Sequence, residues 1–79
     1  MKPSLGQTVI FGSTEGECAA LITKVWSDQD LTGNMSASVN LTVFEDGKLP
    51  YPVSSVMLYA SKEKAYGGYG ACWWPDRVI

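Results

Sequence analysis

Apolar and polar side chains alternate strictly over residues 36–44. The alternating positions are Val39, Leu41 and Val43 on one side, and Ser38, Asn40 and Thr42 on the other. This is the period of a strand with one buried face and one solvated face. The chain continues with Asp46 and Gly47, a pair that supplies the positive φ needed in tight turns. The centre of the chain is therefore predicted to form a strand that ends in a hairpin turn.

Four further short runs of apolar and β-branched residues are separated by residues typical of turns and loops. They cover residues 7–12, 18–26, 49–59 and 71–79. Run 18–26 has the length of a short helix, but its β-branched residues favour a strand. Pro50 and Pro52 place the start of run 49–59 at a sheet edge or a bulge. Five short strands predict a single all-β domain over residues 1–79, a small five-stranded antiparallel barrel of the SH3-like or OB-like kind.

The chain is short for a barrel that has to be stable by itself. With 79 residues, the apolar area that it can bury stabilises the fold by about as much as ordering the chain costs. The monomer is therefore predicted to be only marginally stable. Because burial of surface against another copy would offset this deficit, we expect a homo-oligomer.

Histidine is absent from the sequence, and this excludes several kinds of site. A Ser-His-Asp triad, a Cys-His dyad and every zinc site that contains His are impossible. The two cysteines, Cys18 and Cys72, cannot form a four-thiolate zinc site, and in a reducing cytosol we expect them to be buried as small apolar residues. The acidic residues of the loops lack the spacing of a calcium-binding loop. We therefore expect no catalysis, no metal and no cofactor.

The charge balance is slightly acidic. Six Lys and Arg stand against eight Asp and Glu, which gives a net charge of -2. No basic cluster is present, so binding to duplex nucleic acid is not expected. No apolar run approaches the ~20 residues of a membrane-spanning helix, and the start of the chain lacks the apolar stretch of a signal peptide. We expect no membrane contact and a location in the cytoplasm.

Aromatic, cationic and glycine residues concentrate in residues 59–77. The candidate ligand-binding residues of this segment are Lys62, Lys64, Tyr66, Tyr69, Trp73, Trp74 and Arg77. The rings would stack on bases, and the cations would meet phosphates. Asn40 and Thr42, on the polar face of the central strand, would contact base or ribose edges. In the alternative interpretation, one tryptophan plugs the barrel, the tyrosines cover a subunit interface, and Asn40 and Thr42 are ordinary solvated positions.

The positions of the tryptophans in the sequence allow a further prediction. Trp73 and Trp74 are adjacent, and adjacent residues of a strand point to opposite faces. At most one of them is therefore expected in the core, and the other faces solvent, a ligand or another chain. Trp26, at the end of run 18–26, is expected to pack in the core or at the barrel rim, with stacking on a ligand as the alternative.

Three blocks of the sequence carry a family resemblance. The chain opens with Met-Lys-Pro-Ser-Leu-Gly-Gln-Thr-Val, contains Val-Asn-Leu-Thr-Val-Phe-Glu-Asp-Gly at residues 39–47, and ends with Ala-Cys-Trp-Trp-Pro-Asp-Arg-Val-Ile. Together these blocks resemble a family of small tailed-phage and prophage proteins of unassigned function. That family has a central Val-Asn-Leu-x-Val-Phe-x-Asp-Gly stretch and closes near Gly-Thr-Trp-His-Trp-Pro-Glu-Arg. The closing motif is matched at Gly70, Trp74, Pro75 and Arg77, and it is not matched at Ala71, Cys72, Trp73 and Asp76.

The resemblance implies a phage accessory protein in the cytoplasm of the infected bacterial host. Our first hypothesis is an oligomeric barrel that sequesters a nucleotide-type immune signal without turning it over. The alternative is a protein-binding module that inhibits a host defence protein or serves as a virion component. Its mark would be an exposed aromatic patch with acidic surroundings, for which Trp26 with Glu45 and Asp46 would qualify. Binding of single-stranded nucleic acid is a third hypothesis, which the acidic charge disfavours.

Overall fold

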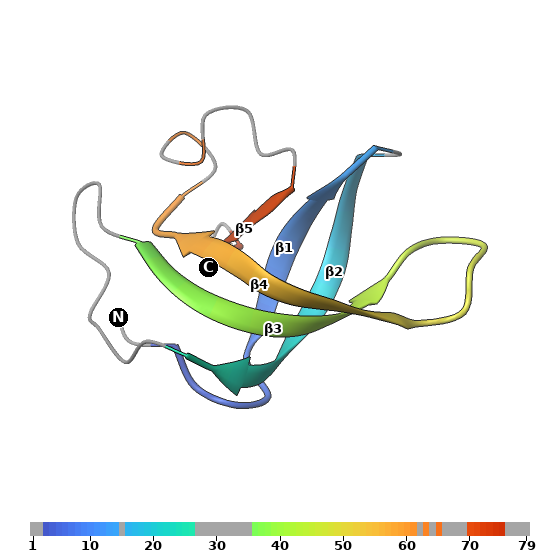
Figure 1. The fold of residues 1–79 in the computed structure, drawn as a ribbon. Helices are drawn as coiled ribbons and strands as arrows, with labels where there is room; N and C mark the ends of the chain where they lie inside the picture. The colour runs from blue at the N-terminus through green and yellow to red at the C-terminus, as the bar shows by residue number, and fades with distance from the viewer. Residues whose placement is uncertain are drawn as a thin grey trace.

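The computed structural model describes residues 3–14, 16–26, 36–61, 63, 65 and 70–75. These residues form five strands (Figure 1): β1 (Thr8–Ser13), β2 (Gly16–Val25), β3 (Ser36–Phe44), β4 (Tyr51–Tyr59) and β5 (Ala71–Trp73). The predicted central strand agrees with β3 residue for residue, and the second run is a strand, as its β-branched residues predict. Among the described residues, no helix has the length and apolarity required to cross a membrane.

The five strands close into a barrel in the order of the sequence, which confirms the prediction of a small all-β barrel. The pairs β1–β2, β2–β3, β3–β4 and β1–β5 are antiparallel, whereas β4–β5 is parallel. The predicted antiparallel barrel thus contains one parallel pair. The reason is one of parity, because five strands that alternate in direction cannot form a closed ring without one parallel pair.

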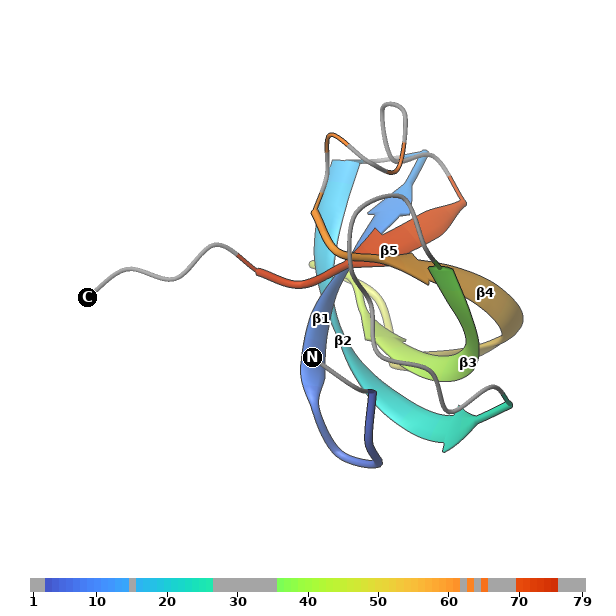
Figure 2. The ribbon, with the colours of Figure 1, turned by 90° about the vertical axis from the view of Figure 1, so that its left-hand side faces the viewer.

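The strands curve around a common interior (Figure 2), and one cluster of buried residues forms the main hydrophobic core. Its buried residues are Val9, Phe11, Cys18, Ala20, Ile22, Ala37, Val39, Leu41, Val43, Val56, Leu58 and Cys72. On β3 the buried and the partly exposed residues alternate along the whole strand, as the period of two requires. Both cysteines are buried free thiols, which confirms their predicted place.

A second, smaller cluster lies on the other face of β5. It consists of Ala65, Ala71 and Trp73, with Ile10 and Tyr59 packed against it. Trp73 is only 4% exposed there, while Trp74 packs against the main core. The two rings do occupy opposite faces, as alternation predicts. The expectation that one of them faces solvent, a ligand or another chain is wrong for Trp73, because residues of the same chain bury it.

The shortness of β5 leaves the barrel incompletely paired at one end. β5 pairs with β4 only at Met57–Tyr59 and with β1 only at Ile10 and Phe11. The first half of β4 therefore has no β5 residue beside it, in agreement with the edge position that its prolines predict. The connection from β3 to β4 crosses this end and turns at Gly47, whose φ of 80° confirms the predicted Asp-Gly turn.

Candidate functional site

Trp26 is an exposed tryptophan that is nevertheless held in place. The residue is 55% exposed, so the expectation that it packs in the core is wrong; it lies directly after the end of β2. The indole Nε1–H donates a hydrogen bond of 2.8 Å to Oδ1 of Asn40. The ammonium of Lys24 lies 4.0 Å from the ring centroid, which is within the range of a cation–π interaction. The ring is thus oriented by two contacts while much of its surface stays open to solvent.

Asn40, which accepts the hydrogen bond from this ring, lies at an irregularity in the sheet. The register of β2 against β3 shifts between Ile22 and Lys24, and the register of β3 against β4 shifts between Val39 and Leu41. Asn40 lies at both shifts, and its Oδ1 also accepts a hydrogen bond of 2.8 Å from the backbone N–H of Ser55. Ser55 itself has a φ of 55°, a conformation that is uncommon for a residue other than glycine. Bulges of this kind re-aim side chains, and here the amide of Asn40 links Trp26 to β4.

The sheet face around Trp26 carries further exposed apolar side chains. The backbone N–H of Trp26 donates to the carbonyl of Ser38, and Ser38 is paired with Met57 on β4. Met57 is exposed, as is Phe44 at the far end of β3. At ~3.3 Å per residue, Ser38 and Phe44 lie about 20 Å apart along the strand. We refer to this outward surface of β2, β3 and β4 as the Trp26 face.

A pocket of about 290 Å³ opens at the incompletely paired end of the barrel. Its walls include Phe11 of β1 and Tyr51 and Val53 of β4. Tyr51 and Val53 are partly exposed there, because β5 does not reach the first half of β4. Glu45 and Lys48, from the β3–β4 connection, are the charged residues among its lining.

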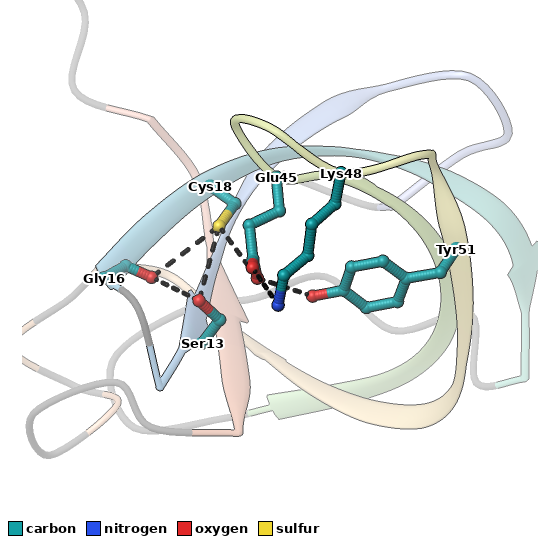
Figure 3. Close-up of polar contacts among 6 residues, drawn as sticks. All are labelled: Ser13, Gly16, Cys18, Glu45, Lys48 and Tyr51. Atoms are coloured by element: carbon teal, nitrogen blue, oxygen red, sulfur yellow. Dashed lines mark hydrogen bonds and ion pairs between the residues drawn. The ribbon is translucent and has the colours of Figure 1, made fainter.

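Glu45 is the centre of a polar network in this pocket (Figure 3). The Tyr51 hydroxyl donates to Oε1 of Glu45 at 2.9 Å, and Nζ of Lys48 lies 2.6 Å from Oε2. On the other side, Sγ of Cys18 contacts Oε1 at 3.9 Å and the Ser13 hydroxyl at 3.4 Å. The hydrogen bond from Lys48, followed by the one from Tyr51, lowers the pKa of Glu45, so this largely buried carboxyl group is ionised at neutral pH. Burial, followed by the hydrogen bond to Glu45, raises the pKa of Tyr51.

The structure brings together few of the residues predicted to bind a nucleotide. Trp73 and Trp74 pack in two different clusters on opposite faces of β5, and Asn40 uses its oxygen to hold Trp26 and Ser55. Thr42 is partly exposed on β3. The remaining candidates lie outside the described residues: Lys62, Lys64, Tyr66, Tyr69 and Arg77. Nucleotide binding by that segment stays a prediction.

Sequence reasoning did not anticipate the burial of Glu45. This residue was expected to contribute to an acidic surface beside Trp26, but it is only 7% exposed and engages Tyr51 and Lys48. The signal was present in the sequence, since the alternation that buries Val39, Leu41 and Val43 reaches residue 45 with one more step of two. Asp46 is exposed in the turn.

Replacing Asn40 with alanine tests its role as the anchor of Trp26. The indole N–H of Trp26 and the backbone N–H of Ser55 lose their shared acceptor. We therefore expect the free energy of unfolding to fall by about 1–2 kcal/mol, at ~1 kcal/mol per hydrogen bond. Urea unfolding followed by circular dichroism measures the change. Asn40→Asp keeps an acceptor oxygen and should recover much of the loss. An unchanged stability in Asn40→Ala would show that the amide does not hold the ring.

Comparison with known proteins yields no match: no protein-family model, no curated protein and no solved structure is significantly similar to this chain. The candidate sites described above therefore depend on the geometry of the chain itself.

Proposed function

We propose that this chain is a non-catalytic binding protein and that the Trp26 face docks a protein partner. The observation that carries the proposal is the state of Trp26, a residue that is 55% exposed although Asn40 and Lys24 hold its ring. A large ring that is already oriented gives up little conformational freedom when a partner covers it. Tryptophan is also among the residue types that dominate the binding energy of protein interfaces.

The composition of the Trp26 face supports a protein as the occupant. Aromatic residues and methionine are enriched in protein interfaces and charged residues are depleted from their centres. The exposed apolar side chains here are Trp26, Met57 and Phe44, and the outward positions of β3 between them are Ser38, Asn40 and Thr42. Lys24 is the cation next to the ring. The partner that fits is an apolar protein surface that carries a carboxylate opposite Lys24.

The nature of the partner follows from the phage resemblance, as part of the same proposal. A small phage protein of this kind would use the Trp26 face against a host defence protein or a component of the virion. Sequestration of a nucleotide signal is the less supported function, because three of its four described candidates, Trp73, Trp74 and Asn40, are engaged within the chain.

The experiment combines capture with titration. Wild-type protein, Trp26→Ala and Leu49→Ala are immobilised and exposed to a host lysate, and the protein retained by the wild type is purified and titrated against each variant. Leu49 is the matched control because it is an exposed apolar side chain in the β3–β4 connection, outside the Trp26 face. We expect Trp26→Ala to weaken binding by about 30-fold or more, the effect of losing a residue worth ~2 kcal/mol, and Leu49→Ala to bind like the wild type.

Two outcomes would contradict the proposal. Equal binding by Trp26→Ala, when circular dichroism shows that it is folded, would place the partner elsewhere on the protein. Self-association that is lost in Trp26→Ala would make the face an interface between copies of this chain. Trp26→Phe, which keeps a ring but not the N–H donor, provides the intermediate case if the alanine variant does not fold.

A further inference from the structure

The pocket at the open end of the barrel has the construction of a site for a cation. Its lining includes Glu45, whose side chain is 6% exposed. The same lining contains the apolar and aromatic side chains of Phe11, Tyr51 and Val53. The volume of about 290 Å³ is several times the ~30 Å³ that a water molecule occupies in the liquid. A buried anion in a lining with apolar side chains matches a small molecule that has a positive head and an aliphatic body.

Lys48 shows which kind of cation this pocket accepts. Its Nζ lies 2.6 Å from Oε2 of Glu45, a short charge-assisted contact. The aliphatic stem reaches in from the exposed β3–β4 turn, where the backbone N–H of Lys48 donates to the carbonyl of Glu45 at 3.1 Å. The side chain as a whole remains 55% exposed. The chain thus places its own primary ammonium group on the buried carboxylate, by means of a side chain that is long and largely open to solvent.

The other contacts of Glu45 come from residues of the strands. The position of the Lys48 ammonium group is therefore the one that a ligand would take. Oε1 accepts the hydrogen bond from Tyr51, which is part of β4, and contacts Cys18 of β2. Both of these residues belong to barrel strands, whose backbone pairing fixes their Cα positions beside Glu45. Lys48, in contrast, lies in the β3–β4 connection, and its side chain is 55% exposed. An external ammonium group that displaces this side chain would take the position of Nζ on Oε2.

We infer that this pocket binds a primary ammonium group on a short aliphatic chain, with Glu45 as its counter-ion, and that the Lys48 side chain competes for the same position. The ligand class is a primary alkylamine, either as a free small molecule or as the side chain of a lysine on another protein. This site lies apart from the Trp26 face, and the inference does not depend on the proposed function.

The test uses n-butylammonium chloride as the probe and removes the internal competitor. Binding is followed by the amide chemical shifts of Gly12, Ser13 and Glu45 at constant ionic strength. We expect Lys48→Ala to bind the probe at least tenfold more tightly than the wild type. Lys24→Ala is the matched control, because it removes one lysine on the Trp26 face and should bind the probe like the wild type.

Further arms separate recognition of the charge from simple filling of the pocket. In the Lys48→Ala background, 1-butanol has the same body without the charge and should not bind, and Glu45→Gln should abolish binding of the amine. Nα-acetyl-lysine amide compared with n-butylammonium distinguishes a protein-borne lysine from a free amine. The inference is overturned if Lys48→Ala shows no saturable shift, if 1-butanol binds as well as the amine, or if Lys24→Ala gains as much affinity as Lys48→Ala. If Glu45→Gln does not fold, the comparison of 1-butanol with the amine still tests whether the pocket recognises the positive charge.

Discussion

Replacing Trp73 with alanine is expected to lower the free energy of unfolding by about 3–5 kcal/mol, the usual cost of removing a buried tryptophan side chain. Trp73 is 4% exposed and is the largest member of the cluster that also contains Ala65 and Ala71. The small side chains around it cannot fill the space that the indole leaves. For a domain of 79 residues, a loss of this size is a large part of the total stability.

Urea unfolding followed by far-ultraviolet circular dichroism measures this effect without relying on tryptophan fluorescence. Trp26→Ala is the matched control, because it removes the same side chain from an exposed position. We expect its loss of stability to be several-fold smaller than that of Trp73→Ala. Trp73→Phe, which retains a ring in the cluster, should lie between the alanine variant and the wild type.

The same pair of variants separates two roles for Trp73. If this ring stacked on a nucleotide and contributed nothing to packing, Trp73→Ala would fold with nearly wild-type stability and would lose only ligand binding. A stability within about 1 kcal/mol of the wild type, well below the cost of a buried tryptophan, would therefore contradict the packing described here. The ring would then have to be assigned to a binding surface.

The local pattern of the sequence predicts the strands well, and β3 is the clearest case. Strict alternation over Ser36–Phe44 specifies both the strand and the face that it buries, because a period of two is a local property of the chain. The last run, residues 71–79, was predicted as a short strand interrupted by Pro75. The strand ends at Trp73, and residues 76–79 lie outside the described part of the chain. Pro75 follows closely and cannot donate a hydrogen bond to a neighbouring strand.

Features that depend on the closure of the barrel could not be predicted in the same way. The parallel direction of β5 follows from the number of strands in the ring, and the burial of Trp73 depends on Ala65, which no alternation rule places beside it. The exposure of Trp26 depends on the register shifts at Asn40, which local propensity does not encode. The candidate sites arise from these non-local features. Sequence reasoning named Trp26 for the alternative hypothesis of a protein-binding module, but it did not place Glu45 in a pocket.

The second large effect is expected in alkaline solution. Burial raises the pKa of the Cys72 thiol to about 12. The unfolded chain releases this proton at the ordinary thiol value of about 8.5–9, while the folded protein holds it. Stability is therefore fully present below the ordinary value and is lost as the pH rises towards 12. The free energy of unfolding should fall by about 1.4 kcal/mol for each pH unit in this window.

Urea unfolding at several pH values between about 9 and 11 measures this slope. Alanine variants of the two cysteines show which thiol causes it. The loss over that range should reach about 2 kcal/mol in the wild type, given the slope of ~1.4 kcal/mol per unit.

Cys72→Ala should be less stable at neutral pH, because it opens a small cavity, but its stability should fall much less steeply with pH. The part that remains includes Tyr51, whose raised pKa gives a loss of the same sign at still higher pH. Cys18→Ala retains the Cys72 thiol and should keep the steep fall. If the free energy of unfolding fell equally with pH in Cys72→Ala and in the wild type, the Cys72 thiol would not be the group whose proton burial retains.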